Sequence, residues 1–221
     1  MKIRVVYSLL IDTNIYMNSI YQFAWLKHGR EDMQKKLLSK YPIDFQEQLQ
    51  SAKNTKQAKV IIRKYLKNNY KNNQLLYKQS AKLLTKVWKK EEKKIIEQLE
   101  TLFNNKFPFE KITIFFTTAP ICPYNYNKRW IAVVCKATPE IQINILKHEL
   151  NHFMFYFYYS ELKMTLTTEK FESLKESLTV FTNPEEQGYP NHQKLRAWLK
   201  SQKSPIPEIL KSSEWEEYIG I

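Results

Sequence analysis

The sequence of 221 residues is poor in glycine and in cysteine, and each shortage excludes a class of protein. Its three glycines, Gly29, Gly188 and Gly220, lie far apart. A phosphate-binding loop or a dinucleotide-binding fingerprint needs several glycines at fixed spacing, so neither is expected. The two cysteines, Cys122 and Cys135, are too few for a disulfide scaffold. They suit a reducing compartment, where we expect them to be two small buried side chains.

The sequence also lacks a long apolar run. A membrane span needs about 20 apolar residues, and the aromatic run FMFYFYY at 153–159 is far shorter. The apolar run near the start, in MKIRVVYSLLIDTN, is too short for a secretory signal, and Asp12 follows it at once. We therefore expect a cytoplasmic protein with no membrane partner.

The composition points to a folded and strongly basic chain. Hydrophobic residues make up 43% and aromatic residues 14%, which is enough for a real core. The formal net charge of +13 suggests contact with a polyanion. However, the chain is rich in Lys, Asn, Ile and Tyr and poor in Gly and Ala, a mixture typical of an AT-rich genome. Arginine, which nucleic-acid readers often use, is rare beside lysine. The composition alone therefore does not favour a nucleic-acid partner.

One short motif carries chemistry. Residues 147–152 read KHELNH and contain His-Glu-x-x-His, with His148 and His152 four residues apart. On a helix two such side chains lie one turn apart on the same face, where their imidazoles can hold one metal ion. Glu149 lies beside His148 and can take a proton from a water at the open coordination position. The alternative is two unrelated histidines on a packed helix.

The residues around the motif predict a buried helix. Thr138 is a good N-cap, Pro139 suits the first helical position, and Glu140 favours the positive end of the helix dipole. Apolar residues then recur at helical spacing in two stripes, which predicts burial on most sides. These stripes contain Ile141, Ile145 and Phe155, and Ile143, Leu146, Leu150, Phe153 and Phe157. The polar groups at 148–152 need partners in such a setting, and a metal would provide them.

The rest of the chain predicts an α+β fold: a small β-sheet packed on the motif helix, with a mostly helical N-terminal part. We expect domains at 1–107 and 108–221, the second ending in a C-terminal helical lobe. Strands are expected at 2–11, 111–117 and 130–136. Helices are expected at 12–28, capped by Asp12 or Thr13, and at 30–40, 43–53, 55–69 and 72–104.

A third metal ligand is expected on the next helix, at 169–182. Its acidic residues Glu169, Glu172 and Glu176 are spaced three and four apart and share one side. Glu176, 24 residues after His152, is the preferred ligand, and Glu172 is the alternative. The apolar stripe of this helix faces away from Glu176. A metal site therefore requires the helix to be covered on both sides, and otherwise the three carboxylates form an exposed acidic face.

These motifs resemble the zincin metallopeptidases and, among them, the gluzincins. The resemblance covers about residues 110–190. His148, Glu149 and His152 match the family motif, and the sequence around Glu176 is similar to the family's Asn-Glu pattern, with Lys175 in place of the asparagine. The resemblance implies a Zn²⁺ ion held by His148, His152 and Glu176.

The resemblance also implies a mechanism, namely metal-assisted hydrolysis of a peptide or protein substrate with Glu149 as the general base. Tyr189 and His192 are candidate donors to the oxyanion, or else side chains that cap a turn. Two other functions stay open. One is a DNA-associated protease similar to SprT-like proteins, which would need His192 as a ligand. The other is a non-enzymatic helical binding protein with an inert metal site.

Overall fold

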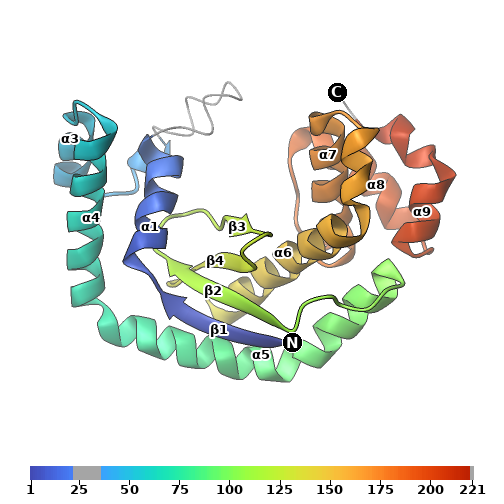
Figure 1. Ribbon diagram of the computed structural model, residues 1–221, viewed down its shortest axis with the longest axis horizontal. Coiled ribbons are helices and arrows are strands. Elements are labelled where there is room, and N and C mark those ends of the chain that lie inside the picture. The colour runs from blue at the N-terminus through green and yellow to red at the C-terminus, as the bar shows by residue number, and fades with distance from the viewer. Residues whose placement is uncertain (22–35, 220–221) are drawn as a thin grey trace. The chain divides into compact units, whose positions relative to one another are not determined.

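The computed structural model of the chain describes residues 1–21 and 36–219. It is an α+β protein, as the sequence predicts, with many helices and one small sheet (Figure 1). The expected helices at 12–28 and 30–40 lie partly outside the described residues. No helix in the described ranges combines the length and the apolar character that crossing a membrane requires.

The sheet has four strands in the order β1-β2-β4-β3, and it is mixed. Strands β2 and β4 run parallel, and β3 pairs antiparallel with β4 at the edge. The two strands expected in the middle of the chain are confirmed, whereas the two-residue β3 was not foreseen because a loop rich in proline surrounds it. The strands are β1 (Lys2–Tyr7), β2 (Lys111–Thr117), β3 (Tyr124–Asn125) and β4 (Trp130–Val134).

The chain forms two compact units, each assembled from separate segments. The first contains residues 1–2, 86–111 and 143–221, and the second contains residues 3–85 and 112–142. The sequence suggested a division at 107/108, but both units draw segments from either side of that position.

The second unit is built around a cluster of apolar side chains from short helices. Helix α4 (Thr55–Asn72) packs on α1 (Leu9–Tyr16) and α3 (Ile43–Gln50), and Figure 1 shows α4 standing beside them. A π-helical turn (Met17–Tyr21) continues α1. The buried cluster includes Ile15, Tyr16, Met17, Ile20, Phe45, Leu49, Ala58, Ile62 and Leu66.

The first strand is shorter than expected, because a helix cap comes earlier. The strand ends at Tyr7, and the side chain of Ser8 accepts a hydrogen bond from the backbone of Ile11 at 3.3 Å. Helix α1 therefore begins at Leu9, and the prediction that Asp12 or Thr13 is the cap was wrong. Asp12 is instead fully buried inside the helix.

The first unit contains the motif helix and the C-terminal helices. Figure 1 shows α7, α8 and α9 gathered around the C-terminal part of α6. The unit also contains the C-terminal part of α5 and several 3₁₀ turns, of which η4 (Thr179–Phe181) and η5 (Pro190–His192) flank the site described below. The helices are α5 (Gln74–Phe103), α6 (Pro139–Tyr159), α7 (Thr168–Leu178), α8 (Gln193–Ser201) and α9 (Ile206–Ser212).

Helix α7 is covered along most of its length. All residues from Phe171 to Leu178 are buried or partly buried. The ring of Phe155 on α6 lies 5.1 Å from that of Phe171, and α8 also packs on α7. A metal site at Glu176 was expected only if this helix is covered on both sides, and the structure shows such covering.

Candidate metal centre

The two histidines of the motif lie one turn apart on α6, and their side chains converge. Their ring centroids are 4.5 Å apart, and the ring planes are nearly perpendicular at 81°. The helix begins where the sequence predicts, since the carbonyl of Thr138 accepts a hydrogen bond from the backbone of Gln142 at 2.9 Å. Because the helix continues through the motif, His148 and His152 lie on one face, four residues apart.

Helix α7 brings the carboxylate of Glu176 to both rings. Its Oε2 lies 3.4 Å from Nε2 of His148, and its Oε1 lies 3.3 Å from Nε2 of His152. One ligand atom from each of the three residues lies within 4.8 Å of the others, the only such group in the described parts of the chain. The carboxylate of Glu176, predicted as the third ligand, therefore lies next to both histidines.

The spacing of these atoms would allow the three side chains to hold one metal ion, and zinc gives a scale for comparison. Zinc lies about 2.0–2.2 Å from nitrogen and oxygen ligands, so two ligands of one tetrahedral ion are about 3.3–3.6 Å apart. Each of the two nitrogen–oxygen distances falls in this range, 3.4 Å from His148 to Oε2 of Glu176 and 3.3 Å from His152 to Oε1, and both are longer than an ordinary hydrogen bond. Two imidazoles and a carboxylate are also a donor set that zinc accepts. The side chains of His148 and Glu176 are 18% and 23% exposed, so water can reach the centre.

A second carboxylate orients one of the histidines. Oε2 of Glu186 lies 2.9 Å from Nδ1 of His148. When His148 is neutral, its Nδ1–H donates to Glu186, and the lone pair of Nε2 is left facing Glu176. Carboxylates hold metal-binding histidines in this way in many proteins.

Glu149 is the buried acid of the motif. It is 7% exposed, and its Oε2 has no hydrogen-bond partner within the described residues. Burial raises the pKa of Glu149 to about 8. At neutral pH this raised pKa keeps Glu149 mostly protonated, and a cation bound beside it would favour the ionised form that can accept a proton.

A buried lysine adjoins the ligand carboxylate. Nζ of Lys175 lies 3.1 Å from Oε1 of Glu176 and 2.5 Å from Oε2 of Glu172, and the Lys175 side chain is 4% exposed. Glu172 also accepts a hydrogen bond from the hydroxyl of Tyr156 at 3.1 Å. Since Glu172 is engaged by these two groups and lies outside the ligand group, the geometry favours Glu176 as the third ligand.

The charges at the centre shift the pKa values of its members. Burial lowers the pKa of His152 to about 3. Burial also acts to lower the pKa of His148, but Glu176 and Glu186 outweigh it and raise that pKa to about 10. Burial acts to raise the pKa of Glu176, yet His152, His148 and Lys175 hold it well below its usual range. Glu176 is therefore ionised, as a ligand must be, whereas His148 carries a proton at neutral pH that a bound metal ion would have to displace.

An arginine holds the loop that carries Glu186. Nη1 of Arg196, on α8, donates to the carbonyl of Glu176 at 3.2 Å, and Nη2 donates to the carbonyl of Glu186 at 2.7 Å. Arg196 is 4% exposed. It thus ties the backbone of one carboxylate residue to that of the other. Gly188 has a φ of +66°, and a Cβ there would lie 2.7 Å from Cδ of Arg196.

The remaining two candidates lie just after this loop. Tyr189 is 44% exposed and His192 is 7% exposed, and their rings meet edge to face at 5.4 Å. Burial lowers the pKa of His192. His192 is not in the group of potential ligands, so the geometry does not favour the histidine-ligand arrangement of the SprT-like alternative.

Sequence reasoning missed three of the residues that shape the centre: Glu186, Lys175 and Arg196. Glu186 lies in a loop, where no periodic pattern relates it to His148. The ion pair of Lys175 with Glu172 could have been predicted, because the two residues are three apart on one helix. Arg196 acts on backbone carbonyls, and the sequence carries no sign of such contacts.

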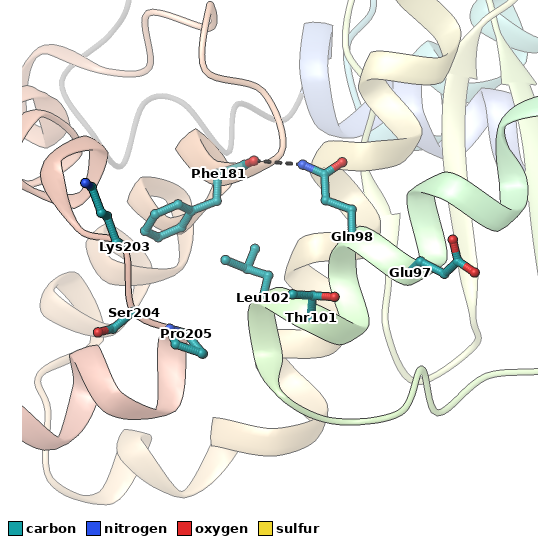
Figure 2. Close-up of a pocket in the computed structure, with 8 residues that line it drawn as sticks. All are labelled: Glu97, Gln98, Thr101, Leu102, Phe181, Lys203, Ser204 and Pro205. Carbon is teal, nitrogen blue, oxygen red and sulfur yellow. Dashed lines mark hydrogen bonds between the residues drawn. The ribbon is translucent and has the colours of Figure 1, made fainter.

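A hollow of about 410 Å³ lies elsewhere in the same unit, between α5, η4 and the segment 203–205. Figure 2 shows the side-chain amide of Gln98 donating to the carbonyl of Phe181 at its edge, at 3.0 Å. No residue of the candidate centre lines it. We assign no ligand to this hollow.

Comparison with known proteins identifies no relative: no family model, curated protein or solved structure matches the chain.

Proposed function

We propose that this protein is a zinc-dependent metallopeptidase. The observation that supports it is the convergence of His148, His152 and Glu176 within 4.8 Å, with Glu149 buried beside them. The chain is α+β, and a second helix carries the glutamate, as in the zincin group that the motif resembles. In this proposal the fold is zincin-like, and the substrate is a peptide or a protein.

The proposed mechanism follows from the position of each side chain. A Zn²⁺ ion held by the three ligands would supply Lewis-acid chemistry, polarising the scissile carbonyl and acidifying a water molecule. Glu149 takes the proton of the attacking water on its buried oxygen and passes it to the leaving amine. Glu186 holds His148 in the tautomer that presents Nε2. Tyr189 and His192 remain the candidates to donate to the oxyanion.

The test combines metal analysis with peptide hydrolysis. Purified protein, stripped and then repleted, should bind one zinc per chain and cleave members of a mixed peptide library. Glu149→Gln should keep the zinc and lose cleavage by about 10²-fold or more, because it removes the proton acceptor without removing a ligand. His148→Ala, His152→Ala and Glu176→Gln should lose the zinc.

Glu172→Gln is the matched control, since it changes a carboxylate one turn away on the same helix. It should keep both zinc and cleavage. A wild-type chain that binds no zinc contradicts the whole proposal. Zinc bound without cleavage of any peptide contradicts the peptidase and supports the inert binding site. Loss of zinc in Glu172→Gln contradicts the ligand assignment.

A further inference from the structure

The positive charge of the chain is concentrated in one segment. Between Glu47 and Glu91 the sequence holds twelve lysines and arginines and no acidic residue. The remainder of the chain holds 23 basic and 22 acidic residues and is nearly neutral. A bias toward lysine codons acts along the whole chain, so it explains a high lysine total but does not explain this concentration.

Helix α4 arranges part of this charge in a row. Lys56, Lys59, Arg63, Lys67 and Lys71 are spaced three, four, four and four residues apart, which places them on one face of the helix. All five are exposed. At 1.5 Å per residue the row is about 22 Å long. We call these five residues the α4 basic row.

A neighbouring face of α4, which is buried, fixes the row in place. Ala58, Ile62 and Leu66 are fully buried in the core of their unit. Because this apolar face is already covered, the helix cannot insert it into a lipid bilayer as a membrane-binding amphipathic helix would. Any partner of α4 is therefore held by the charged face.

In the described parts of the chain, no ion pair neutralises the charges of the row. Within the described residues none of the five side chains forms an ion pair, whereas Lys93 on α5 lies 3.8 Å from Glu97 one turn on. Like charges four residues apart destabilise a helix by about 0.2–0.5 kcal/mol per pair. Lys59, Arg63 and Lys67 form two such pairs, and a polyanion would relieve their repulsion.

The surface of α4 favours a double-stranded partner. Proteins that bind single strands stack the bases on exposed aromatic rings. The two tyrosines of α4, Tyr65 and Tyr70, are engaged instead: their rings stack on Phe45 and Tyr7 at 4.2 Å in each case. A row of charges at regular helical spacing suits the regularly spaced phosphates of a stiff duplex.

We propose that the α4 basic row binds the phosphate backbone of a nucleic-acid duplex, without reading its sequence. Only one of the five residues is an arginine, so bidentate contacts to bases are not expected. The proposal rests on charge and burial in the second unit and is independent of the proposed peptidase.

The test measures binding of the full chain to labelled 24-base-pair DNA and RNA duplexes of two unrelated sequences, by fluorescence anisotropy at several salt concentrations. Wild-type protein should bind both sequences equally and lose affinity steeply with salt. The variant Lys59→Gln/Arg63→Gln/Lys67→Gln should bind about tenfold more weakly or worse at low salt. The slope of log K against log salt should fall by about 2–3, near one unit per lost phosphate contact.

The control is Lys94→Gln/Lys200→Gln/Lys211→Gln, which removes the same charge from exposed sites outside the row. It should change the affinity less than twofold, and circular dichroism should show both variants folded. If the two variants lose the same amount of duplex affinity, the loss comes from net charge and not from the row, and the proposal is overturned. No salt-dependent duplex binding at 50 mM salt would overturn it too, as would tighter binding to single strands or to phosphatidylserine vesicles.

Discussion

At the scale of single residues, the candidate centre depends on a carboxylate that lies outside both of its helices. Glu186 accepts from Nδ1 of His148 but is 38% exposed, so its removal should not harm the fold. Glu186→Gln should lower zinc affinity by about tenfold or more, since partners of ligating histidines typically contribute that much. Competition against a chromophoric chelator measures it.

The neighbouring Glu185 provides the control for this prediction. It is exposed, carries the same charge, and differs from Glu186 by one position. Glu185→Gln should leave zinc affinity unchanged. If both substitutions weaken zinc binding equally, general charge near the centre is responsible, and the hydrogen bond to His148 is not.

A second prediction concerns Asp12, which is buried in the other unit. Burial raises the pKa of Asp12 from 3.8 to about 6, although the hydroxyl of Thr117 donates to its Oδ1 at 2.5 Å. The folded state thus binds the proton more tightly than the unfolded state. The stability that Asp12 contributes is complete below pH 3.8 and is lost as the pH rises through 6, by about 3 kcal/mol.

Asp12→Asn should remove this dependence. In urea unfolding between pH 4 and pH 7, the unfolding free energy of the variant should rise relative to that of the wild type as the pH rises. Thr117→Val should steepen the wild-type loss, because it removes a donor that stabilises the ionised form. Parallel stability curves for wild type and Asp12→Asn would contradict the burial argument.

At the scale of elements, the connection from α7 to α8 requires a glycine. Gly188 has a left-handed backbone conformation, which other residues rarely adopt. A Cβ at this position would also clash with the side chain of Arg196, which hydrogen bonds to backbone carbonyls hold in place. Gly188→Ala should therefore cost about 1–2 kcal/mol of unfolding free energy. The adjacent and exposed Gln187→Ala should cost under about 0.5 kcal/mol. A neutral Gly188→Ala in urea unfolding would show that Arg196 can move.

The boundaries and packing of these elements could be predicted from the sequence only in part. The start of α6 follows from Thr138 and Pro139, because caps and fixed φ angles act locally. The end of β1 was misplaced, because Ser8 competes with the β-branched residues before it and the cap prevails. The covering of α7, and with it the approach of Glu176, depends on α8 packing against it. Contacts of that kind join segments that no local pattern relates.

At the scale of the whole molecule, the chain cannot be divided into two contiguous folding pieces. Separating residues 1–107 from 108–221 would take three strands from the second unit and the C-terminal part of α5 from the first. Neither fragment should unfold cooperatively in urea, whereas the full chain should. A fragment with a cooperative transition and a dispersed NMR spectrum would contradict the division into these units.

This discontinuity has a consequence for synthesis on the ribosome. The histidines of α6 emerge before α7 does, and the first unit cannot form until its segment 143–221 is available to pack with segment 86–111. Until α7 has emerged, a nascent chain offers these two imidazoles without Glu176, so it would capture an ion only weakly. Tight metal binding would therefore follow the synthesis of α7.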